Sequence, residues 1–512
     1  MLTIENLSII HSKDLTPLIE GLSFSVQPGE RMALIGEEGN GKSTLLRAIA
    51  KDSRIESYCE ISGSIVNTFK TAYLPQELPA EDREKSAYAF FSECESFFDQ
   101  TPRQLGSLAA RVHLPADVFY SEQEMSSFSG GERVKLQICR LMMDSPDLLL
   151  LDEPSNDLDM ETVRWLESFL VSSRLTVLFV SHDETLLSRA ATGVILLERL
   201  RRRQVPRAGV SRLGYDDFVK SRADLFARQE QVARKQREEL DKKMERYNQI
   251  RNRVEHEQNA VSRRDPGTAR LLKKKMHTVM SMGRRFEREA KEMTAMPESE
   301  EAIFARLECE PLPASKSVLN LNLDRLQIEG RTLAAPVRLS VAAADKICIT
   351  GRNGVGKSTL LRLIRDMLIK RADLRVFYMP QDPSHMLDLR LSPIEILTKT
   401  GDKEENVRIC VALGSMKFTA EEMTHPCSAL SGGQKAKLMF LSMAFSGANV
   451  LVLDEPTRNL SPLSGPVVRE LFDHYPGCII AVSHDVRFAR QVCKRIVTLT
   501  PDGFTETNFD TF

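Results

Sequence analysis

The sequence predicts an α/β protein in which two similar domains flank a long antiparallel helical hairpin. Two observations support this fold class. A set of short motifs occurs twice with constant spacing, and the segment between the two sets has helical periodicity and a basic composition. The length of 512 residues corresponds to about three domains at roughly 150 residues each. Apolar residues make up 42% of the chain, so each domain can bury a sizeable core.

Composition and charge exclude several classes of protein. The 70 Lys and Arg residues balance 71 Asp and Glu, which excludes a uniformly basic nucleic-acid-binding coat, and we expect no DNA partner. No apolar run approaches the roughly 18 residues of a membrane span, so we expect no membrane partner. The N-terminus resembles no signal peptide, and the nine scattered cysteines form no Cys-x-x-Cys pair. We therefore expect a cytoplasmic protein with reduced thiols.

Four motifs are repeated along the chain. A Gly-x-x-x-x-Gly-Lys-Ser-Thr-Leu-Leu sequence begins at Gly36 and again at Gly351. Ser-Gly-Gly, Leu-Asp-Glu-Pro and Val-Ser-His-Asp motifs follow, and all three pairs are offset by 302 residues. Independent chance motifs would not share one offset, so the chain contains a duplication. The first half has 13 extra residues before its Ser-Gly-Gly motif, and ten of them lie around residues 51–70.

Short apolar runs predict the strands that carry these motifs. Two runs end at the glycine-rich loops, two end in carboxylates and two end at Ser-His; a helix is expected to begin at each Lys-Ser-Thr-Leu-Leu. The expected strands are 31–35, 147–151 and 175–180 in the first half and 346–350, 449–453 and 478–482 in the second. This order of strands and helices is typical of an α/β nucleotide-binding fold.

The segment between the two halves has a different composition. From residue 220 to 291, Lys and Arg are about twice as frequent as Asp and Glu, and Gly and Pro are absent before Asp265-Pro266-Gly267. Apolar residues recur mostly every seven positions before this turn and at helical spacing after it: Leu225, Val232, Leu240, Tyr247, Val254 and Val261, then Leu272, Met276, Val279, Phe286, Ala290 and Met293. The pattern predicts two antiparallel helices, the first of about 40 residues. We place the domains at 1–205, 206–312 and 313–512, with the hairpin tip near 259–270.

Each glycine-rich motif predicts a phosphate-binding loop. Glycines allow backbone N–H groups to crowd around phosphate oxygens, the lysine reaches the same oxygens, and the serine hydroxyl ligates Mg²⁺. The helix that follows presents its positive end to the anion. The predicted residues are Gly36, Gly39, Gly41, Lys42, Ser43 and Thr44 in the first half and Gly351, Gly354, Gly356, Lys357, Ser358 and Thr359 in the second.

Carboxylate pairs follow the apolar strands that come next. Asp152 and Asp454 can hold Mg²⁺ directly or through water. The adjacent Glu153 and Glu455 can polarise the water that attacks the γ-phosphate. A carboxylate pair at a strand end can also be a helix cap or a solvated turn, but a phosphate-binding loop at consistent spacing in each half favours the catalytic interpretation.

Repeated histidines and glutamines complete each predicted site. His182 and His484 end strands after a serine, and their repetition predicts contact with the γ-phosphate. Gln76 and Gln381 lie in Tyr-x-Pro-Gln sequences, in a loop that can touch Mg²⁺ and the attacking water. The predicted magnesium ligands are therefore Ser43, Gln76, Asp152, Ser358, Gln381 and Asp454.

These motifs in this order resemble those of the ATP-binding cassette (ABC) ATPases, over roughly residues 1–205 and 313–512. The resemblance implies that two cassettes face each other head to tail and enclose two ATP molecules with Mg²⁺. Each site is then closed by the Ser-Gly-Gly motif of the other half, and hydrolysis of ATP to ADP and phosphate separates the cassettes. The implied closing residues are Ser129, Gly130, Gly131, Ser431, Gly432 and Gly433. The implied catalytic residues are Glu153, His182, Glu455 and His484.

Two cassettes joined by a charged helical hairpin resemble the ABC-F family. This implies a monomer that enters the ribosomal exit-tRNA site, near 23S rRNA and the P-site tRNA, and points its hairpin toward the peptidyl-transferase centre. Residues 454–464 and 259–266 resemble the branch that protects ribosomes from lincosamides, pleuromutilins and streptogramins A. The implied linker-tip residues are Val261, Ser262, Arg263 and Arg264.

Other interpretations stay open at this stage. The chain could be an ABC-F translation factor without a drug role, an ATPase subunit of a membrane importer, or a non-enzymatic scaffold, and its basic hairpin could be a solvated coiled coil. Glu132 stands where the ABC family usually has Gln, and Ser461 stands where the first half has Asp159, so we expect two unequal sites. Neither half has an obvious aromatic residue for adenine stacking before its glycine-rich loop.

Overall fold

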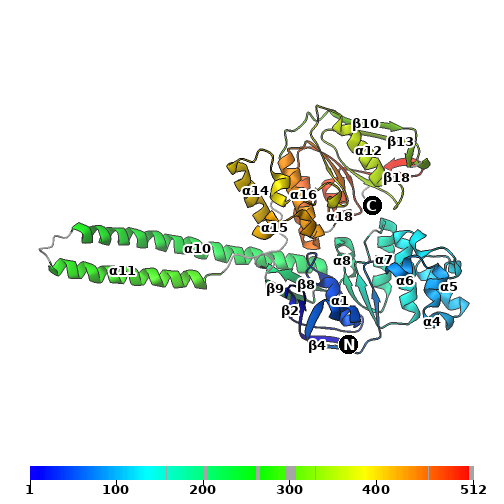
Figure 1. The fold of residues 1–512 in the computed structure, drawn as a ribbon, viewed down its shortest axis with the longest axis horizontal. Coiled ribbons are helices and arrows are strands. Elements are labelled where there is room, and N and C mark those ends of the chain that lie inside the picture. The colour runs from blue at the N-terminus through cyan, green and yellow to red at the C-terminus, as the bar shows by residue number, and fades with distance from the viewer. Residues whose placement is uncertain are drawn as a thin grey trace. The chain divides into compact units, whose positions relative to one another are not determined.

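The computed structural model describes residues 1–156, 158–200, 205–260, 266–294, 307–328, 330–458 and 460–506 (Figure 1). The chain separates into two compact units, one formed by Met1–Tyr215 with Glu300–Phe512 and the other by Asp216–Ser299. The first unit contains both nucleotide-binding cassettes, and the second is the helical hairpin. The predicted tip residues Val261, Ser262, Arg263 and Arg264 lie outside the described residues.

A six-stranded sheet forms the centre of the first cassette. In spatial order its strands are β5 (Thr71–Leu74), β6 (Leu148–Asp152), β7 (Thr176–Val180), β3 (Arg31–Ile35), β8 (Gly193–Arg199) and β9 (Val205–Ser211). The first five are parallel, and β9 pairs antiparallel with β8. Because β9 belongs to this sheet, the sheet continues past residue 205, where the sequence placed the end of the first domain.

The second cassette repeats this topology. Its sheet contains β15 (Val376–Met379), β16 (Val450–Asp454), β17 (Cys478–Val482), β14 (Lys346–Thr350), β18 (Arg495–Thr500) and the antiparallel β19 (Gly503–Glu506). The equivalent strands follow the same order as in the first cassette, which confirms the duplication. The strands expected before the carboxylates lie one residue further along the chain than predicted, because they include the aspartates themselves.

Both faces of each sheet are covered, which explains the continuous apolar runs. In the second cassette, Val450 and Val452 pack toward the cluster that includes helix α12 (Lys357–Ile369). Leu451 and Leu453 on the same strand pack into the opposite cluster, which includes α16 (Gly432–Ser446) and α17 (Gly465–Asp473). The first cassette has the equivalent helices α1 (Lys42–Ala50), α6 (Gly130–Met143) and α7 (Met160–Ser172). Helices α8 (Glu184–Ala190) and α18 (Val486–Val492) follow β7 and β17.

Smaller helices lie between the glutamine loop and the Ser-Gly-Gly motif in each half. In the first half these are α2 (Ala80–Arg83), α3 (Ala87–Ser92), α4 (Glu95–Phe98), α5 (Pro102–Arg111), η2 (Ala116–Tyr120) and η3 (Met125–Ser127). In the second half they are η4 (Pro383–His385), α13 (Pro393–Leu397), α14 (Lys403–Ser415), α15 (Ala420–Thr424) and η5 (Cys427–Ala429). The short η6 (Pro462–Ser464) precedes α17.

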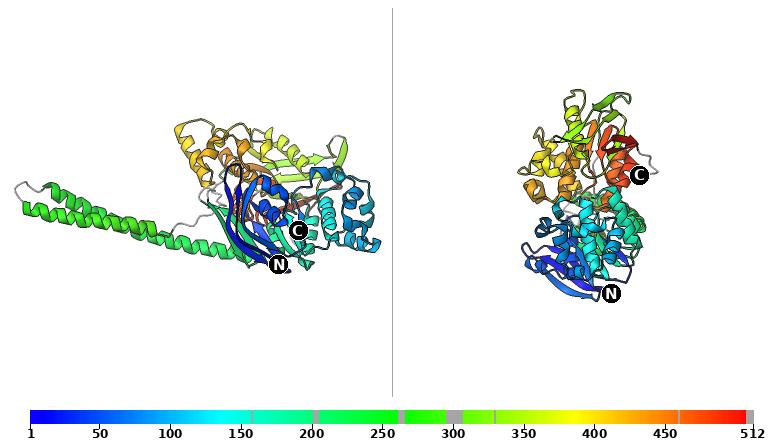
Figure 2. Two further views of the ribbon diagram at one scale, coloured as in Figure 1. Left: turned by 60° about the horizontal axis from the view of Figure 1, so that its bottom comes forward. Right: turned by 90° about the vertical axis from the view of Figure 1, so that its right-hand side faces the viewer.

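The extra residues of the first half add a strand to its small antiparallel sheet. This sheet has the order β2 (Pro17–Val26), β1 (Leu2–His11) and β4 (Cys59–Asn67), and its dark blue strands are visible in Figure 2. The insertion around residues 51–70 forms η1 (Ser53–Ser57) and β4. The second half has the pairs β10 (Ser317–Leu323) with β13 (Val337–Ala342) and β11 (Leu326–Ile328) with β12 (Arg331–Ala334). Most of the length difference between the halves therefore lies in one edge strand, β4, and in η1, which precedes it.

The hairpin consists of α10 (Tyr215–Ala260), with 46 residues, and α11 (Pro266–Glu292), with 27. At 1.5 Å per residue α10 is about 69 Å long. The helices are antiparallel, since Tyr247 contacts Phe286 edge to face and Lys243 forms an ion pair with Glu289. Tyr247, Val254 and Val279 form its buried core.

The heptad pattern of the first hairpin helix begins later than the sequence suggested. Leu225 and Val232 are 61% and 47% exposed, and Ala290 is exposed on the other helix. The chain after α11 reaches only as far along α10 as Gln236, whose Oε1 accepts a hydrogen bond from Thr294 N at 2.8 Å. Within the hairpin unit, the described part of α11 and the residues that follow it is too short to cover the first turns of α10.

In the described part of the chain, no helix combines the length and the apolar composition that crossing a lipid bilayer requires.

Candidate functional site: two composite nucleotide sites

The glycine-rich loops lie between a central strand and a helix N-terminus in both cassettes. Gly36 has φ 151°, and a Cβ there would lie 2.2 Å from the carbonyl oxygen of Leu197. Gly351 has φ 144°, and a Cβ would lie 2.5 Å from the oxygen of Leu499. Each loop therefore requires glycine at its first position, because a neighbouring strand passes against the backbone.

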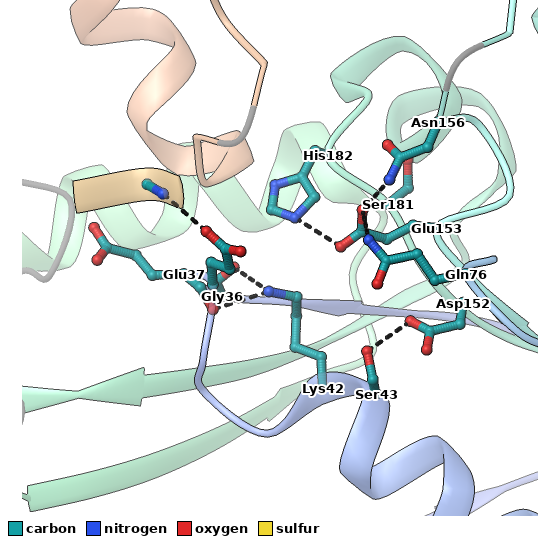
Figure 3. Close-up of polar contacts among 12 residues, drawn as sticks. Gly36, Glu37, Lys42, Ser43, Gln76, Asp152, Glu153, Asn156, Ser181 and His182 are labelled. Atoms are coloured by element: carbon teal, nitrogen blue, oxygen red, sulfur yellow. Dashed lines mark hydrogen bonds and ion pairs between the residues drawn. The ribbon is translucent and has the colours of Figure 1, made fainter. Parts of the chain in front are cut away.

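The lysine of each loop donates hydrogen bonds to backbone carbonyl oxygens of the same loop. Lys42 Nζ donates to the carbonyl oxygens of Gly36 and Glu37, both at 2.9 Å (Figure 3). Lys357 Nζ donates to the oxygen of Gly351 at 2.8 Å and to that of Arg352 at 3.0 Å. Both ammonium groups thus point into the concave side of a loop, where a phosphate would be bound.

The donor set for a magnesium ion is assembled in each cassette. Ser43 Oγ donates to Asp152 Oδ1 at 3.0 Å (Figure 3). The Tyr73 hydroxyl lies 3.2 Å from Oδ2 of the same carboxylate. In the second cassette Asp454 Oδ1 is buried, and it makes no hydrogen bond with any described residue. Burial raises the pKa of both aspartates.

These residues fit Mg²⁺ in both chemistry and electrostatics. Serine hydroxyl and carboxylate oxygens are the hard ligands that this cation prefers. A divalent cation would also offset the cost of burying a carboxylate that has an unused oxygen. When bound, it supplies neutralisation of the charge on the phosphate oxygens. Ser43 with Asp152, and Ser358 with Asp454, would hold it.

Glu153 is held by three side chains around its carboxylate. His182 Nε2 lies 3.2 Å from Oε1, Gln76 Nε2 donates to Oε2 at 3.3 Å, and Asn156 also donates to Oε2 (Figure 3). Burial raises the pKa of Glu153, but the hydrogen bond and the charge of His182 outweigh this effect and lower the pKa to about 2. Glu153 is therefore ionised at neutral pH, as a group that accepts a proton from water must be.

Glu455 has a different environment from its counterpart. Its Oε2 accepts a hydrogen bond from the backbone N–H of His484 at 3.2 Å, while Oε1 is buried and 3.7 Å from His484 Nε2. Burial raises the pKa of Glu455 to about 8 and lowers that of His484 to about 4. At neutral pH this glutamic acid is mostly protonated and the histidine is neutral, so the two sites are unequal in this structure.

The departures that suggested unequal sites have structural roles of their own. Glu132 and Gln434 occupy equivalent positions, and each forms a reciprocal capping box with the serine at the start of its helix, Ser129 or Ser431. The Glu-for-Gln difference therefore preserves the helix cap. Asp159 caps α7 through Thr162 N, whereas Ser461 caps the short η6.

The Ser-Gly-Gly motif of the second cassette contacts the glycine-rich loop of the first, and the motif of the first cassette borders the same cavity as the loop of the second. At the first site Gly433 N donates to Glu38 Oε2 at 2.8 Å, and Lys437 forms a buried ion pair with Glu37. At the second site Gly130 shares a cavity of about 610 Å³ with six residues of the second loop and its helix, namely Asn353, Gly354, Gly356, Lys357, Ser358 and Thr359. The structure thus brings together residues of the two cassettes that are about 220 to 400 positions apart in the sequence.

Many of the other predicted residues border these cavities, whereas Ser129, Gly131 and Ser431 are not among the lining residues. Gln76, Lys42 and Thr44 line the first site, together with Glu153 and His182. The second cavity is lined by Gly354, Gly356, Lys357, Ser358, Thr359, Gln381, Asp454, Glu455 and His484. The first-cassette His182 joins the two halves, because its Nδ1 lies 2.6 Å from the carbonyl oxygen of Leu460.

Several residues in these sites were missed by the sequence reasoning. Glu37, Glu38 and Lys437 join the first loop to the second Ser-Gly-Gly helix. Glu37 and Glu38 have different residues, Arg352 and Asn353, at the equivalent positions of the second loop, so no repeat marks them. Tyr73 was within reach of prediction, since it begins the repeated Tyr-x-Pro-Gln sequence. No aromatic residue was found for adenine, and the structure instead places aliphatic side chains beside the loops: Leu18 at the first site, and Ile328 and Leu333 at the second.

Comparisons with known proteins agree with this architecture. The family described as ABC transporter matches residues 19–156 and 334–458, about half of the chain. ABC transporter F family member 5 of Arabidopsis thaliana is 27% identical over 96% of this chain and 73% of its own length. The energy-dependent translational throttle protein EttA of Escherichia coli is 27% identical over 96% of this chain and 91% of its own length. Among solved structures, the archaeal ribosome recycling factor aABCE1, in complex with the stalk protein aP1, has a TM-score of 0.60 at 15% identity, over 98% of this chain and 89% of that one, which shows a shared fold.

The predicted fold class and the ATPase activity are thereby confirmed. Two cassettes of the matched family, each with a phosphate-binding loop, an Asp-Glu pair at a strand end and a Ser-Gly-Gly helix, hydrolyse ATP. The chain therefore belongs to the ABC transporter family and is an ATPase of the ABC-F type.

Proposed function

We propose that this ATPase binds the bacterial-type ribosome with its cassettes closed on ATP and leaves after hydrolysis. In this proposal the hairpin approaches 23S rRNA and the P-site tRNA from the exit-tRNA site. Its tip, including Val261, Ser262, Arg263 and Arg264, protects the peptidyl-transferase centre against lincosamide, pleuromutilin or streptogramin A antibiotics. The protein acts in the cytoplasm as a monomer, with Mg²⁺ and ATP as cofactors.

The observation that carries the proposal is that each glycine-rich loop faces the opposite Ser-Gly-Gly helix, in direct contact at the first site and across a shared cavity at the second. Gly433 reaches the first loop, and Gly130 shares the second cavity. A triphosphate at either loop would join two cassettes, and its hydrolysis would remove the γ-phosphate from that junction. Nucleotide state would thereby become cassette separation, which is a means of timed binding to a large partner.

The charge of the hairpin supports RNA as the partner. Lys and Arg are about twice as frequent as Asp and Glu over residues 220–291, although the whole chain has a net charge of −1. Neutralising phosphates with these side chains would release counterions, so binding should weaken steeply as salt increases. One relative, EttA, is named as an energy-dependent translational throttle protein, which associates that relative with translation.

A trapped variant tests the proposal directly. Glu153→Gln with Glu455→Gln replaces both glutamates that were predicted to activate the attacking water, so ATP should hold the cassettes closed. In sucrose gradients containing ATP, we expect this variant to sediment with ribosomes and the wild type to be released. Lys42→Ala with Lys357→Ala, which weakens phosphate binding at both loops, is the matched control and should stay free. A trapped variant that sediments free of ribosomes would contradict the proposal.

Similarity to EttA over 91% of its length favours a second candidate, a translation factor with no role against drugs. Both candidates predict ribosome binding by the trapped variant. A drug-susceptibility test separates them: in a strain that produces the chain, protection should raise the inhibitory concentration of at least one of the three drug classes. Replacement of Arg263 and Arg264 by Ala should abolish that increase. Unchanged susceptibility in a strain with ribosome-bound protein would leave the translation factor.

A further inference from the structure

The two glycine-rich loops differ at their second and third positions. The first loop has Glu37 and Glu38, whereas the second has Arg352 and Asn353 at the equivalent positions. A carboxylate beside a phosphate-binding loop opposes an anionic ligand, so this difference bears on how the two sites fill with nucleotide. It is independent of the ribosome and concerns only the ATPase itself.

Glu38 occupies the N-terminus of the opposite Ser-Gly-Gly helix. Its Oε2 accepts a hydrogen bond from Gly433 N at 2.8 Å, in the first turn of the 15-residue helix α16. The same oxygen lies 2.7 Å from the position that a Cβ on Gly432 would take. The free N–H groups at a helix start favour an anion, and here the anion is a side chain of the protein.

A neighbouring ion pair holds this loop against that helix. Glu37 forms a buried ion pair with Lys437, about one turn beyond Gly433 on α16, and these side chains are 7% and 2% exposed. The second loop makes a weaker contact, because Arg352 pairs with Glu161 of α7 while both side chains are more than 70% exposed. The counterpart of Lys437 in the first cassette is Lys135, which lies over the ring of Trp165 at 5.3 Å.

The cavity beside the first loop is also smaller than the cavity beside the second. The cavity at the first loop has a volume of about 190 Å³ and is bordered by Glu38, whereas the cavity at the second has about 610 Å³. Pockets for small-molecule ligands usually measure about 300 to 1,000 Å³. The second site is therefore large enough for a nucleotide in this structure, and the first is too small until Glu38 and its surroundings move.

We propose that Glu38 is an internal competitor for the terminal phosphate of ATP at the first site. Its carboxylate holds the Gly433 amide that would otherwise face the phosphate, and Glu37 with Lys437 keeps the two elements in contact. The second site fills with ATP first, and the first site fills when ATP displaces Glu38 from α16. Glu38 is thus a residue that sets the order of binding, without taking part in the chemical step.

Nucleotide affinity of each site tests this proposal. Glu38→Asn gives the first loop the residue found in the second, and it is studied in a Lys357→Ala background so that the first site dominates binding. By isothermal titration with Mg-ATP, we expect about fivefold tighter binding, because one charge-assisted hydrogen bond of an exposed carboxylate no longer competes. Affinity for Mg-ADP, which lacks the competing phosphate, should change less than about twofold. Glu60→Gln, on exposed β4, is the charge-matched control and should change neither affinity.

The reciprocal change tests the same idea at the other site. Asn353→Glu, in a Lys42→Ala background, should weaken ATP binding at the second loop about fivefold and ADP binding by less. Unchanged ATP affinity in Glu38→Asn would overturn the proposal. Equal gains for ATP and ADP would also overturn it, because they would show a general charge effect on nucleotide binding. If Glu38→Asn does not fold, as judged by its melting curve, Glu38→Gln takes its place, with the same expected results.

Discussion

The buried ion pair between Glu184 and Arg469 should be a main contributor to docking of the two cassettes. Glu184 begins α8 of the first cassette and Arg469 lies on α17 of the second, and their side chains are 6% and 5% exposed. The guanidinium donates to both carboxylate oxygens, and its Nε donates to Gln491 at 2.9 Å. Arg469→Met removes the charge and retains most of the apolar volume.

The expected cost follows from burial and distance. At 3.1 Å, the separation of Nη2 and Oε2, and an effective dielectric constant of about 20, the attraction is about 5 kcal/mol. Removing one partner of a buried pair usually costs about 3 to 5 kcal/mol, because the other charge stays buried. Arg487 Nη1 also donates to Glu184, at 3.1 Å, and would compensate in part. We therefore expect a loss of about 3 kcal/mol in the free energy of unfolding.

Urea denaturation of the nucleotide-free protein measures this loss. Trp165 is the sole tryptophan of the chain, it is 6% exposed in α7, and its fluorescence reports unfolding of the first cassette. Glu161→Gln, which breaks the exposed pair with Arg352, is the control and should cost less than about 1 kcal/mol.

A double variant separates the pair from simple packing. Replacing both Glu184 and Arg469 by Met removes the uncompensated charge and should recover most of the loss. Equal costs for Arg469→Met and Glu161→Gln would refute the reasoning. A double variant less stable than Arg469→Met would also refute it, because the penalty would then come from shape rather than from an unpaired charge.

Three further predictions concern single residues. Gly465→Ala should weaken cassette docking, because the new Cβ would lie 1.8 Å from Glu184 Oε1; the loss should appear in the same urea assay and disappear in a Glu184→Ala background. Asp183 has a pKa raised to about 6 by burial, so its folded form binds a proton more tightly than the unfolded chain and this group adds stability as the pH falls from 7 to 5. Asp183→Asn should remove about 1 to 2 kcal/mol of that pH dependence. The difference in melting temperature between pH 7 and pH 5 should therefore be smaller in the variant than in the wild type, and an equal difference would disprove the role of Asp183. Tyr247→Ala should destabilise the hairpin by about 3 kcal/mol and speed amide hydrogen exchange there, while Leu225→Ala, at a 61% exposed position, should leave exchange unchanged.

The local parts of the fold could be predicted from the sequence for physical reasons. Parallel strands covered on both faces need continuous apolar runs, so residues 346–350 and 478–482 were placed correctly. The first glycine of each loop is required by a neighbouring strand, so the motif itself implies the loop. Even within the 13-residue difference between the halves, spacing located ten residues around 51–70, where the structure has η1 and one additional strand, β4.

The heptad pattern of the hairpin predicted an apolar helix face correctly but not how much of that face is buried. Leu225 and Val232 have the spacing of a packed helix, yet they are exposed because the described return segment of the hairpin reaches only Gln236. Spacing predicts which face is apolar, but the length of the partner decides how much of that face is buried.

The sequence by itself determined the duplication, the positions along the chain of the strands that carry the motifs, and the residues that face each phosphate site. These follow from periodicity and from steric requirements at single positions. Only the tertiary structure decided that Glu38 meets Gly433, that Arg469 meets Glu184, and that Glu153 is ionised while Glu455 is mostly protonated. These features depend on which surfaces of two similar cassettes dock and how far each carboxylate is removed from water. Neither the docking partner nor the local dielectric is encoded in the neighbouring residues of the chain.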